Sequence, residues 1–353
     1  MRGPLIWLYH ILCSGDTETN KRMKTDVIQV DPARLDVEIF RRAASMLRGG
    51  GLIAFPTETV YGLGANALDA AAVARIFEAK GRPATNPVIV HVADSDAVLN
   101  VAADWPETVK LLAAEFWPGP LTLVVAKRPE VPAIVTAGGP TVAVRCPNHP
   151  VAQALIREAG VPVAAPSANR SGELSPTRAE HVLRGLDGRI DMLLDGGPCP
   201  GGIESTVVDV TGPTVRLLRH GLITVAMLEK VVGRIEVRPE AEELARSPGQ
   251  MAKHYSPRTR LRIVDGDSLV DDVLEATHSG KRVGSLMFHG TPLVPGVTPH
   301  ISLPANPDEA AALLYDTLFR LDTSGLDLIL VELPPDEPPW AAIRDRLNRA
   351  AAR

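Results

Sequence analysis

The stretch KGRPATNPVIVH (residues 80–91) joins the end of a helical pattern to the start of a strand pattern. Before it, DAAAVARIFEAKG (residues 69–81) has Asp69 in the capping position and Gly81 at its end, which are the start and stop signals of a helix. After it, the apolar run of PVIVHV (residues 87–92) is typical of a buried strand. A helix, a short loop and a strand in this order predict an α/β fold.

The loop in this stretch is stiff and positively charged. Lys80 and Arg82 stand two residues apart, Asn86 follows, and Pro83 and Pro87 restrict the backbone around them. A solvated helix end is the alternative interpretation, because cations are favoured at any helix C-terminus. The prolines favour a ligand site, since they stiffen the loop more than solubility requires. Lysine and arginine together suit a phosphate group.

The order of the remaining elements predicts two domains. In the first, the strands STVVDV (residues 205–210) and TVRLLR (residues 214–219) follow one another without a helix, which predicts a mixed sheet. Later, LRIV (residues 261–264), KRVGSLMF (residues 281–288) and LDLILVEL (residues 326–333) alternate with helical stretches. This alternation predicts a smaller Rossmann-like C-terminal domain.

The domain boundaries are predicted from changes in composition. Residues 1–24 are interpreted as an N-terminal extension before a domain start near Met23, and residues 25–233 as the first domain. Residues 234–260 are charged and contain prolines, so we interpret them as a linker to the C-terminal domain at 261–353. The apolar run near the start is too short to span a membrane.

Composition excludes several classes of protein. The 353 residues are 45% hydrophobic and 22% charged, which is ordinary for a globular chain, and the net charge is −5. That net negative charge argues against a nucleic-acid backbone as the main partner. It does not exclude a local basic cleft. Cys13, Cys146 and Cys199 lack CxxC spacing, so no disulfide framework or zinc site is predicted. We therefore expect a cytoplasmic protein without membrane association.

Three polar segments follow or precede strands and are candidate ligand loops. PTETVYGLGAN (residues 56–66) is predicted to be a loop after a strand. APSANRSGELSPT (residues 165–177) offers hydroxyl groups among small neighbours, and GGIESTVVD (residues 201–209) places small residues before another strand. Each alone is also compatible with a plain turn, but loops at strand ends commonly hold ligands.

Arg145 ends the apolar strand pattern TVAVRCP (residues 141–147) and shares one face with Thr141 and Ala143 by alternation. A buried arginine requires an anionic partner, for which a ligand carboxylate and a structural Asp or Glu are both candidates. The sequence has no Ser/His/Asp order and no metal-ligand cluster that stands out. The expected site therefore positions and stabilises charge, without a covalent nucleophile.

Taken together, the motifs resemble the YrdC-type threonylcarbamoyl-AMP synthase family. The residues that carry the resemblance occur in order along the chain: PTETVYGLG (56–64), KGRPATNPVIVH (80–91), WPGPLT (117–122), TVAVRCP (141–147), APSANRSGELSPT (165–177) and GGIESTVVD (201–209). The segment SPGQMAKHYSP (247–257) is similar to the linker of the long form, which has an additional C-terminal domain. The resemblance implies a twisted mixed α/β sheet with a large concave cavity. It also implies formation of L-threonylcarbamoyladenylate from L-threonine, bicarbonate and ATP, with release of pyrophosphate.

The resemblance also implies roles for individual residues. For L-threonine it implies contacts from Thr59, His91, Arg145, Ser175, Ser205 and the backbone at Ala165. For the nucleotide it implies Arg82, Asn86, Thr141, Ser167, Arg219 and Tyr255. Lys80 and Arg82 are the predicted catalytic groups near the phosphates, with Mg²⁺ bound to ATP. The motif LLRHG (217–221) departs from the family pattern, which usually has proline where this chain has His220.

Two other functions and one gating hypothesis stay open. A concave surface of this type can bind double-stranded RNA, and a carbamoyl-transfer domain of hydrogenase maturation is similar, although the acylphosphatase-like segment and CxxC motifs of those proteins are absent here. Under the main interpretation, a separate threonylcarbamoyl transferase complex uses the product, and tRNA is only an indirect partner. The segment 247–257 is expected to fold over the site when ATP and threonine are bound, the alternative being a passive tether.

Overall fold

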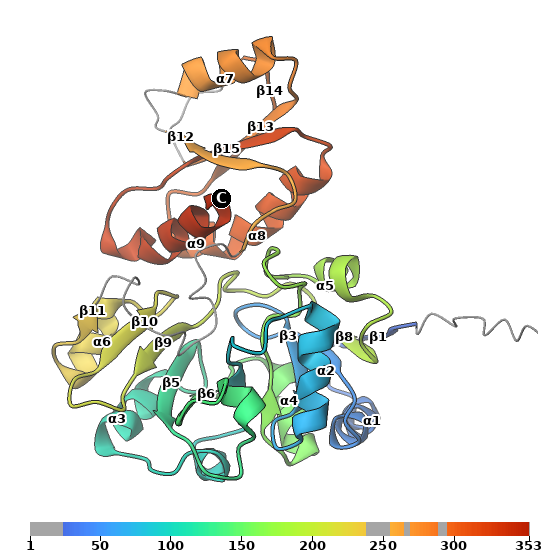
Figure 1. Ribbon diagram of the computed structural model, residues 1–353, viewed down its shortest axis with the longest axis vertical. Helices are drawn as coiled ribbons and strands as arrows, with labels where there is room; N and C mark the ends of the chain where they lie inside the picture. The colour runs from blue at the N-terminus through green and yellow to red at the C-terminus, as the bar shows by residue number, and fades with distance from the viewer. Residues whose placement is uncertain (1–23, 238–254, 265–268, 289–294, 353) are drawn as a thin grey trace, which may run out of the picture.

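A computed structural model describes residues 24–237, 255–264, 269–288 and 295–352 of the chain, which form two α/β units stacked on one another (Figure 1). All but one residue of the predicted N-terminal extension, and residues 238–254 of the predicted linker, lie outside the described residues. Among the described residues, no helix is both long and apolar enough to cross a membrane.

The first unit contains a mixed sheet with the strand order β1-β8-β2-β3-β7-β4-β6-β5-β9-β10-β11. Its strands are β1 (Asp26–Gln29), β2 (Ile53–Phe55), β3 (Gly62–Asn66), β4 (Ile89–His91), β5 (Leu121–Ala126), β6 (Thr141–Arg145), β7 (Val163–Ala164), β8 (Met192–Asp195), β9 (Thr206–Asp209), β10 (Arg216–Arg219) and β11 (Glu236–Val237). Parallel pairs such as β4 with β6 stand beside antiparallel pairs such as β5 with β6, so the prediction of a mixed sheet is confirmed. β11 extends this sheet from within the predicted linker.

Helices cover both faces of this sheet. They are α1 (Val37–Arg48), α2 (Ala70–Lys80), α3 (Glu107–Phe116), α4 (Pro150–Ala159), α5 (Ala179–Leu186) and α6 (Val225–Val232), with short 3₁₀ turns η1 (Asp96–Asn100) and η2 (Ala133–Thr136). The predicted helix before the 80–91 stretch is α2. Asp69 caps it by accepting hydrogen bonds from the amides of Ala71 and Ala72, and Gly81 ends it in the left-handed conformation at φ 61°.

The prediction of a continuous loop over residues 56–66 is wrong in its second half. Gly62–Asn66 is strand β3, antiparallel to β2. A Cβ at Gly64 would lie 2.7 Å from a ring carbon of Phe55 and 2.9 Å from the side chain of Val163. The glycine there makes room for close side-chain packing across the sheet. Glycine is more often interpreted as a turn residue, which is why the sequence predicted a loop.

The second unit is a four-stranded parallel sheet of order β12-β15-β13-β14. Its elements are β12 (Leu261–Val264), α7 (Leu269–His278), β13 (Val283–Phe288), β14 (Val297–Leu303), α8 (Pro307–Thr323), β15 (Leu328–Glu332), the short turn η4 (Pro338–Trp340) and α9 (Ala341–Ala351). In β15, Leu328 and Leu330 pack with the α7 side, while Ile329 and Val331 pack with α8 and α9. These three layers are compatible with the predicted Rossmann-like domain.

Helices α8 and α9 lie between the two sheets and contact the first unit (Figure 1). Val60, Leu174 and Ile203 of the first unit belong to the same buried apolar cluster as Leu314 and Leu318 of α8. The second unit is therefore packed onto the first through a hydrophobic core that both share.

Candidate active site

A pocket forms where the polar loops of the first unit meet the second unit. The loops after β2 and β7 and the loop before β9 reach it, together with the ends of β4, β6 and β10. It is lined by Thr57, Thr59, Val60, Gly62, Arg82, Ile89, His91, Arg145, Ala165, Pro166, Ser167, Glu204, Ser205, Arg219 and Tyr255. Its volume is about 40 Å³, against about 300–1,000 Å³ for typical ligand pockets. A ligand of ordinary size would therefore need more room than the pocket has in this conformation.

The structure brings most of the predicted site residues to this pocket. Those that line it are Thr59, Arg82, His91, Arg145, Ala165, Ser167, Ser205, Arg219 and Tyr255. Lys80, Asn86, Thr141 and Ser175 are not among the lining residues. Thr141 is half-buried at the start of β6, and Ser175 is fully buried beside Glu204. Their predicted ligand contacts stay predictions.

Lys80 is fixed beneath the pocket and does not line it. Its ammonium, which is 1% exposed, donates to the carbonyl oxygens of Ser167 and Asn169 at 2.5 Å each. Burial and the neighbouring Arg82 hold the pKa of Lys80 well below its ordinary value. In this arrangement Lys80 ties the end of α2 to the loop after β7, and its predicted role at the phosphates stays a prediction.

Arg82 both shapes its own loop and lines the pocket. Its Nε donates to the carbonyl of Asn86 at 3.2 Å, and Nη2 donates to the carbonyl of Pro87 at 2.8 Å. Burial lowers the pKa of Arg82 to about 10, so the group stays charged at neutral pH. The stiff loop predicted between the two prolines is therefore closed on itself by this guanidinium.

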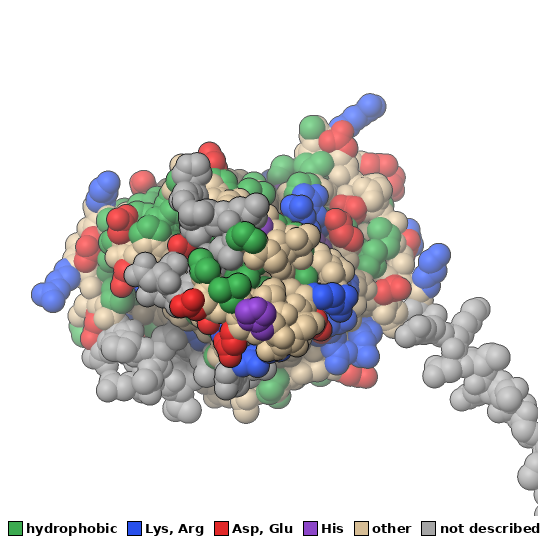
Figure 2. Space-filling view, turned by 90° about the horizontal axis from the view of Figure 1, so that it is seen from above, with side chains coloured by type: hydrophobic (Ala, Val, Ile, Leu, Met, Phe, Trp, Pro, Cys, Tyr) green, Lys and Arg blue, Asp and Glu red, His purple; other side chains and the backbone are tan. Residues whose placement is uncertain are grey.

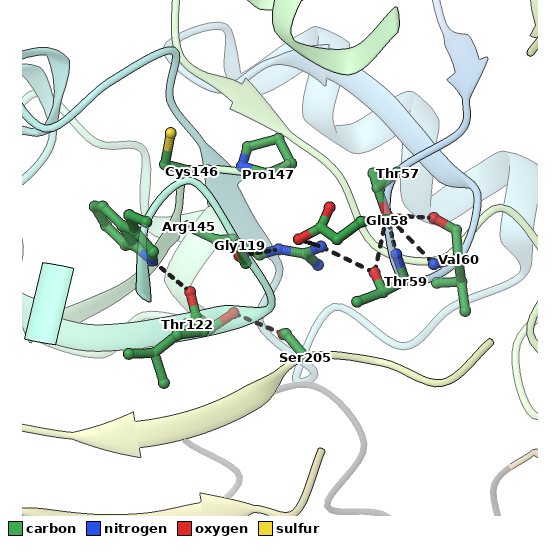
Figure 3. A network of polar contacts seen from close by, with 12 residues as sticks. Thr57, Glu58, Thr59, Val60, Gly119, Thr122, Arg145, Cys146, Pro147 and Ser205 are labelled. Atoms are coloured by element: carbon green, nitrogen blue, oxygen red, sulfur yellow. Dashed lines mark hydrogen bonds and ion pairs between the residues drawn. The ribbon is translucent and has the colours of Figure 1, made fainter. Parts of the chain in front are cut away.

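Arg145 has an anionic partner within the protein (Figure 3). Its Nη2 lies 2.6 Å from Oε1 of Glu58 and donates to Oγ1 of Thr59 at 3.0 Å, while Nε donates to the carbonyl of Gly119 at 3.3 Å. Thr59 is held in turn by Oγ1 of Thr57 at 2.8 Å. Of the two partners left open from the sequence, the structure contains the structural glutamate, while Arg145 still lines the pocket.

His91 is a neutral imidazole next to Arg145. Burial and the charge of Arg145 lower the pKa of His91 to about 3. Its side chain is 3% exposed, and Nδ1 has no hydrogen-bond partner within the described protein. His91 can therefore offer a ligand a neutral nitrogen, and it adds no charge to the site.

Ser205 and Arg219 are joined across two loops. Arg219 donates from Nη2 to Oγ of Ser205 at 3.0 Å and from Nε to the Ser205 carbonyl at 3.0 Å. Ser205 also shares a 2.7 Å hydrogen bond with Thr122 at the start of β5 (Figure 3). After Arg219, the His220 carbonyl accepts a hydrogen bond from Arg346 at 2.9 Å, so the turn that departs from the family pattern is held by the second unit.

Sequence reasoning missed Glu204 and Glu58. Glu204 lines the pocket and is 6% exposed, next to the predicted Ser205. Burial alone would raise the pKa of Glu204, but Arg346 and Arg219 outweigh it and hold that pKa below its ordinary value. The sequence does contain a pattern that could have indicated them: Glu58 and Glu204 each stand directly before a predicted site residue, Thr59 and Ser205.

The described residues do not supply a protein-held metal site. Within the described part of the chain, no group of three His, Cys, Asp or Glu side chains is placed to hold a metal ion. Glu204, which lines the pocket, and Glu58, which pairs with the pocket residue Arg145, each have an arginine partner. The residues present thus do not fit a metal bound by the protein alone.

These features define an α/β protein with a small pocket that carries three arginines at loop and strand ends, and with a second domain packed onto the first. Residues 45–221 match the family model described as Telomere recombination (Sua5, YciO and YrdC), and residues 223–352 match the model described as Threonylcarbamoyl-AMP synthase, C-terminal domain. The chain is 44% identical to the threonylcarbamoyl-AMP synthase of Bacillus subtilis over 88% of this chain and 92% of that one. It is 41% identical to the Pyrococcus abyssi enzyme over 90% and 95% of the two chains.

Solved structures agree with this likeness. The crystal structure of P. abyssi Sua5 complexed with L-threonine superimposes with a TM-score of 0.87 at 40% identity, covering 93% of this chain and 98% of that one. The chain therefore belongs to the threonylcarbamoyl-AMP synthase family, in the long form with the C-terminal domain. It is an enzyme of the nucleotidyltransferase type, and the alternative of an RNA-binding module is not supported.

Proposed function

We propose that this chain forms L-threonylcarbamoyladenylate from L-threonine, bicarbonate and ATP and releases pyrophosphate, for N6-threonylcarbamoyladenosine modification of tRNA. The observation that carries the proposal is the convergence of Arg82, Arg145 and Arg219 on one buried pocket that also contains the hydroxyl groups of Thr59 and Ser205. Three buried guanidinium groups suit a ligand set with several negative charges, as a triphosphate and an amino-acid carboxylate have.

The reaction needs positioning more than a nucleophile from the protein. The deprotonated threonine amine attacks the carbon of bicarbonate, and loss of water leaves a carbamate. A carbamate oxygen then attacks the α-phosphorus of ATP, the bond to the β-phosphate bridging oxygen breaks, and pyrophosphate leaves with its electron pair. Negative charge grows on the phosphates in this step, and fixed guanidinium groups in a dry pocket stabilise it. Closure of the pocket over its ligands would also protect the carbamate from water.

Individual roles are proposed from the family resemblance, and the pocket lining supports them for the residues that reach it. Arg145, with Thr59, His91, Ser175 and Ser205 and the backbone at Ala165, is proposed to bind L-threonine, in keeping with the threonine named in the P. abyssi complex. The second group is proposed to bind ATP: Arg82, Asn86, Thr141, Ser167, Arg219 and Tyr255. Mg²⁺ is proposed only as the ion that accompanies the ATP phosphates, because Glu204 in the pocket lining and the nearby Glu58 are already paired with arginines.

The cellular setting is proposed on the same basis. A separate threonylcarbamoyl transferase complex would accept the product, so tRNA would be only an indirect partner, and the expected location is the cytoplasm. On the face of the second unit seen in Figure 2, acidic and basic side chains are interspersed, which does not resemble the continuous basic surface of a nucleic-acid binder.

One assay tests the proposal. Pyrophosphate release from ATP is measured with both co-substrates, without L-threonine, and without bicarbonate, and the product is identified by mass spectrometry. We expect release that depends on both co-substrates. Release that ignores L-threonine, or a product without the threonylcarbamoyl group, would contradict the proposal.

A further inference from the structure

Helices α8 and α9 bring two buried polar side chains of the second domain to the wall of the pocket. Arg346 of α9 is 1% exposed and Tyr315 of α8 is fully buried. Neither lines the pocket. Arg346 Nε donates to Oε2 of Glu204 at 2.7 Å, and the Tyr315 hydroxyl lies 3.2 Å from both carboxylate oxygens of the same residue. Glu204 does line the pocket, so the second domain reaches the site through it.

The guanidinium of Arg346 holds two loops at once. Nε binds Glu204, the residue before Ser205, and Nη2 donates to the carbonyl of His220, the residue after Arg219, at 2.9 Å. Ser205 and Arg219 are themselves hydrogen-bonded to each other and both line the pocket. Arg346 therefore holds the residues next to Ser205 and Arg219, whose hydrogen bonds to each other form part of the pocket wall.

The segment before β9 and the turn after β10 are packed closely against each other. A Cβ at Gly221 would clash with the backbone of residues 204–206, so the loops are in direct backbone contact. Arg346 also lies over the ring of Tyr255, with its guanidinium carbon 5.0 Å from the ring centre, and Tyr255 lines the pocket. The remaining nitrogen of Arg346 is bound by Asp345, which orients the guanidinium.

We propose that Arg346, supported by Tyr315, is a positioning residue through which the second domain sets the geometry of Ser205, Arg219 and Tyr255 at the active site. The proposal rests on the proposed function for the identity of the ligands. It gives the C-terminal domain a part in substrate binding that acts through residues lining the pocket.

The test uses the full-length chain with Arg346→Lys, Arg346→Met and Tyr315→Phe. Lysine keeps the charge, but a single ammonium cannot span Glu204 and the His220 carbonyl as the fork does. The matched control is Asp316→Asn, which breaks the Arg178–Asp316 ion pair of 2.7 Å elsewhere in the same interface. KM for ATP and L-threonine, kcat, the dissociation constant of ATP from calorimetry and the melting temperature are measured for each.

We expect Arg346→Lys to raise KM and the dissociation constant for ATP by about tenfold while kcat changes by less than about threefold, because loosened loops weaken ground-state contacts. Tyr315→Phe, which removes only the hydroxyl group, should have a smaller effect in the same direction. Asp316→Asn should lower the melting temperature and leave both constants within about twofold of wild type.

Two outcomes overturn the proposal: constants unchanged in folded Arg346→Lys and Tyr315→Phe, or an equal rise in Asp316→Asn, which would mean that only domain packing matters. If Arg346→Met does not fold, the other two variants decide. Failure of the proposed function would show separately, as wild-type protein that makes no threonylcarbamoyladenylate, whereas calorimetry with ATP still reports the positioning effect.

Discussion

Arg145 is a buried guanidinium whose charge is already balanced by Glu58 at 2.6 Å. A substrate carboxylate at Arg145 must therefore share or replace this partner. The sequence of the 141–147 strand predicts that an anion is needed, but cannot say which one, because Glu58 stands 87 positions away and meets Arg145 only through the pairing of the sheet. Competition between the Glu58 carboxylate and the substrate carboxylate for Arg145 can therefore be measured as a change in substrate affinity.

Glu58→Gln tests that competition. The amide has nearly the shape of the carboxylate but no negative charge, so the ion pair with Arg145 is lost and the site becomes more positive. We expect L-threonine to bind about threefold to tenfold more tightly in calorimetry. The free energy of unfolding should fall by about 1–3 kcal/mol, because Arg145 loses a charged partner. Unchanged or weaker threonine affinity in a folded variant would argue that the carboxylate does not meet Arg145.

Arg82→Lys separates charge from geometry at the predicted phosphate site. Lysine preserves the positive charge but cannot reproduce the two hydrogen bonds that Arg82 donates to the Asn86 and Pro87 carbonyls. We expect ATP affinity to fall by about tenfold to a hundredfold, which corresponds to the loss of charge-assisted contacts. L-threonine affinity serves as the internal control and should change little. ATP binding at wild-type strength would remove Arg82 from the nucleotide site.

At the scale of elements, the sequence predicted those features that depend on residues close to one another in the chain. The cap at Asp69 and the stop at Gly81 placed α2 correctly, because both act within one helical turn. Gly64 misled the prediction, since it leaves space for Phe55 on the neighbouring strand and for Val163, which lies 99 positions further along the chain. Glu204 escaped for the same reason: its partner Arg346 is 142 positions away in the other domain.

Gly202 is an element-scale test of domain packing. Its φ is +73°, and an added Cβ would meet the backbone of Ala311 and Ala312 in α8. Gly202→Ala therefore has two costs, left-handed strain and a clash with a helix that cannot yield cheaply. The matched control is Gly160→Ala, at φ +63° after α4, where a Cβ meets nothing within 4 Å.

We expect the control to lose about 1–2 kcal/mol of unfolding free energy, the cost of left-handed strain alone. Gly202→Ala should lose clearly more and should also weaken L-threonine binding, because the loop it belongs to carries Ser205. Both free energies are measured by urea denaturation. Equal losses in the two variants would mean that α8 can move away from the loop freely.

At the scale of the whole molecule, the two domains form one structure around the pocket. Tyr255 stands at the C-terminal edge of the predicted gating segment, is 1% exposed and lines the pocket, whereas residues 247–254 of that segment lie outside the described residues. Gating by this segment stays a prediction. A chain cut before Ser247 would expose the apolar surface that Val60, Leu174 and Ile203 share with α8, so we expect such a chain to aggregate. Protease sensitivity of the intact linker, with and without substrates, is the better test of gating.

The domain interface also predicts how stability responds to acid. His181 of α5 stacks on Phe319 of α8 with ring centres 3.9 Å apart. Burial lowers the pKa of His181 to about 4, although Asp316 and Glu180 oppose this and Arg178 and Arg184 assist it. The imidazole is therefore kept neutral between its partners in the folded protein, while the unfolded chain binds a proton at an ordinary pKa of about 6.5.

The sign of the effect follows from these two values. Between pH 6.5 and about 4, the unfolded state carries a proton on His181 that the folded state lacks, so stability falls as the pH falls. The contribution is fully present above pH 6.5.

His181→Gln removes this contribution, and the free energy of unfolding of that variant should decline less steeply than that of wild type between pH 6.5 and about 4. His278→Gln, an exposed position on α7, is the matched control and should keep the wild-type slope. Because His91 is expected to titrate in the same direction over a window that reaches about pH 3, the measured quantity is the difference in slope between variants. Parallel slopes for wild type and His181→Gln would show that the interface accepts a protonated imidazole, through Asp316 at 3.6 Å from Nε2.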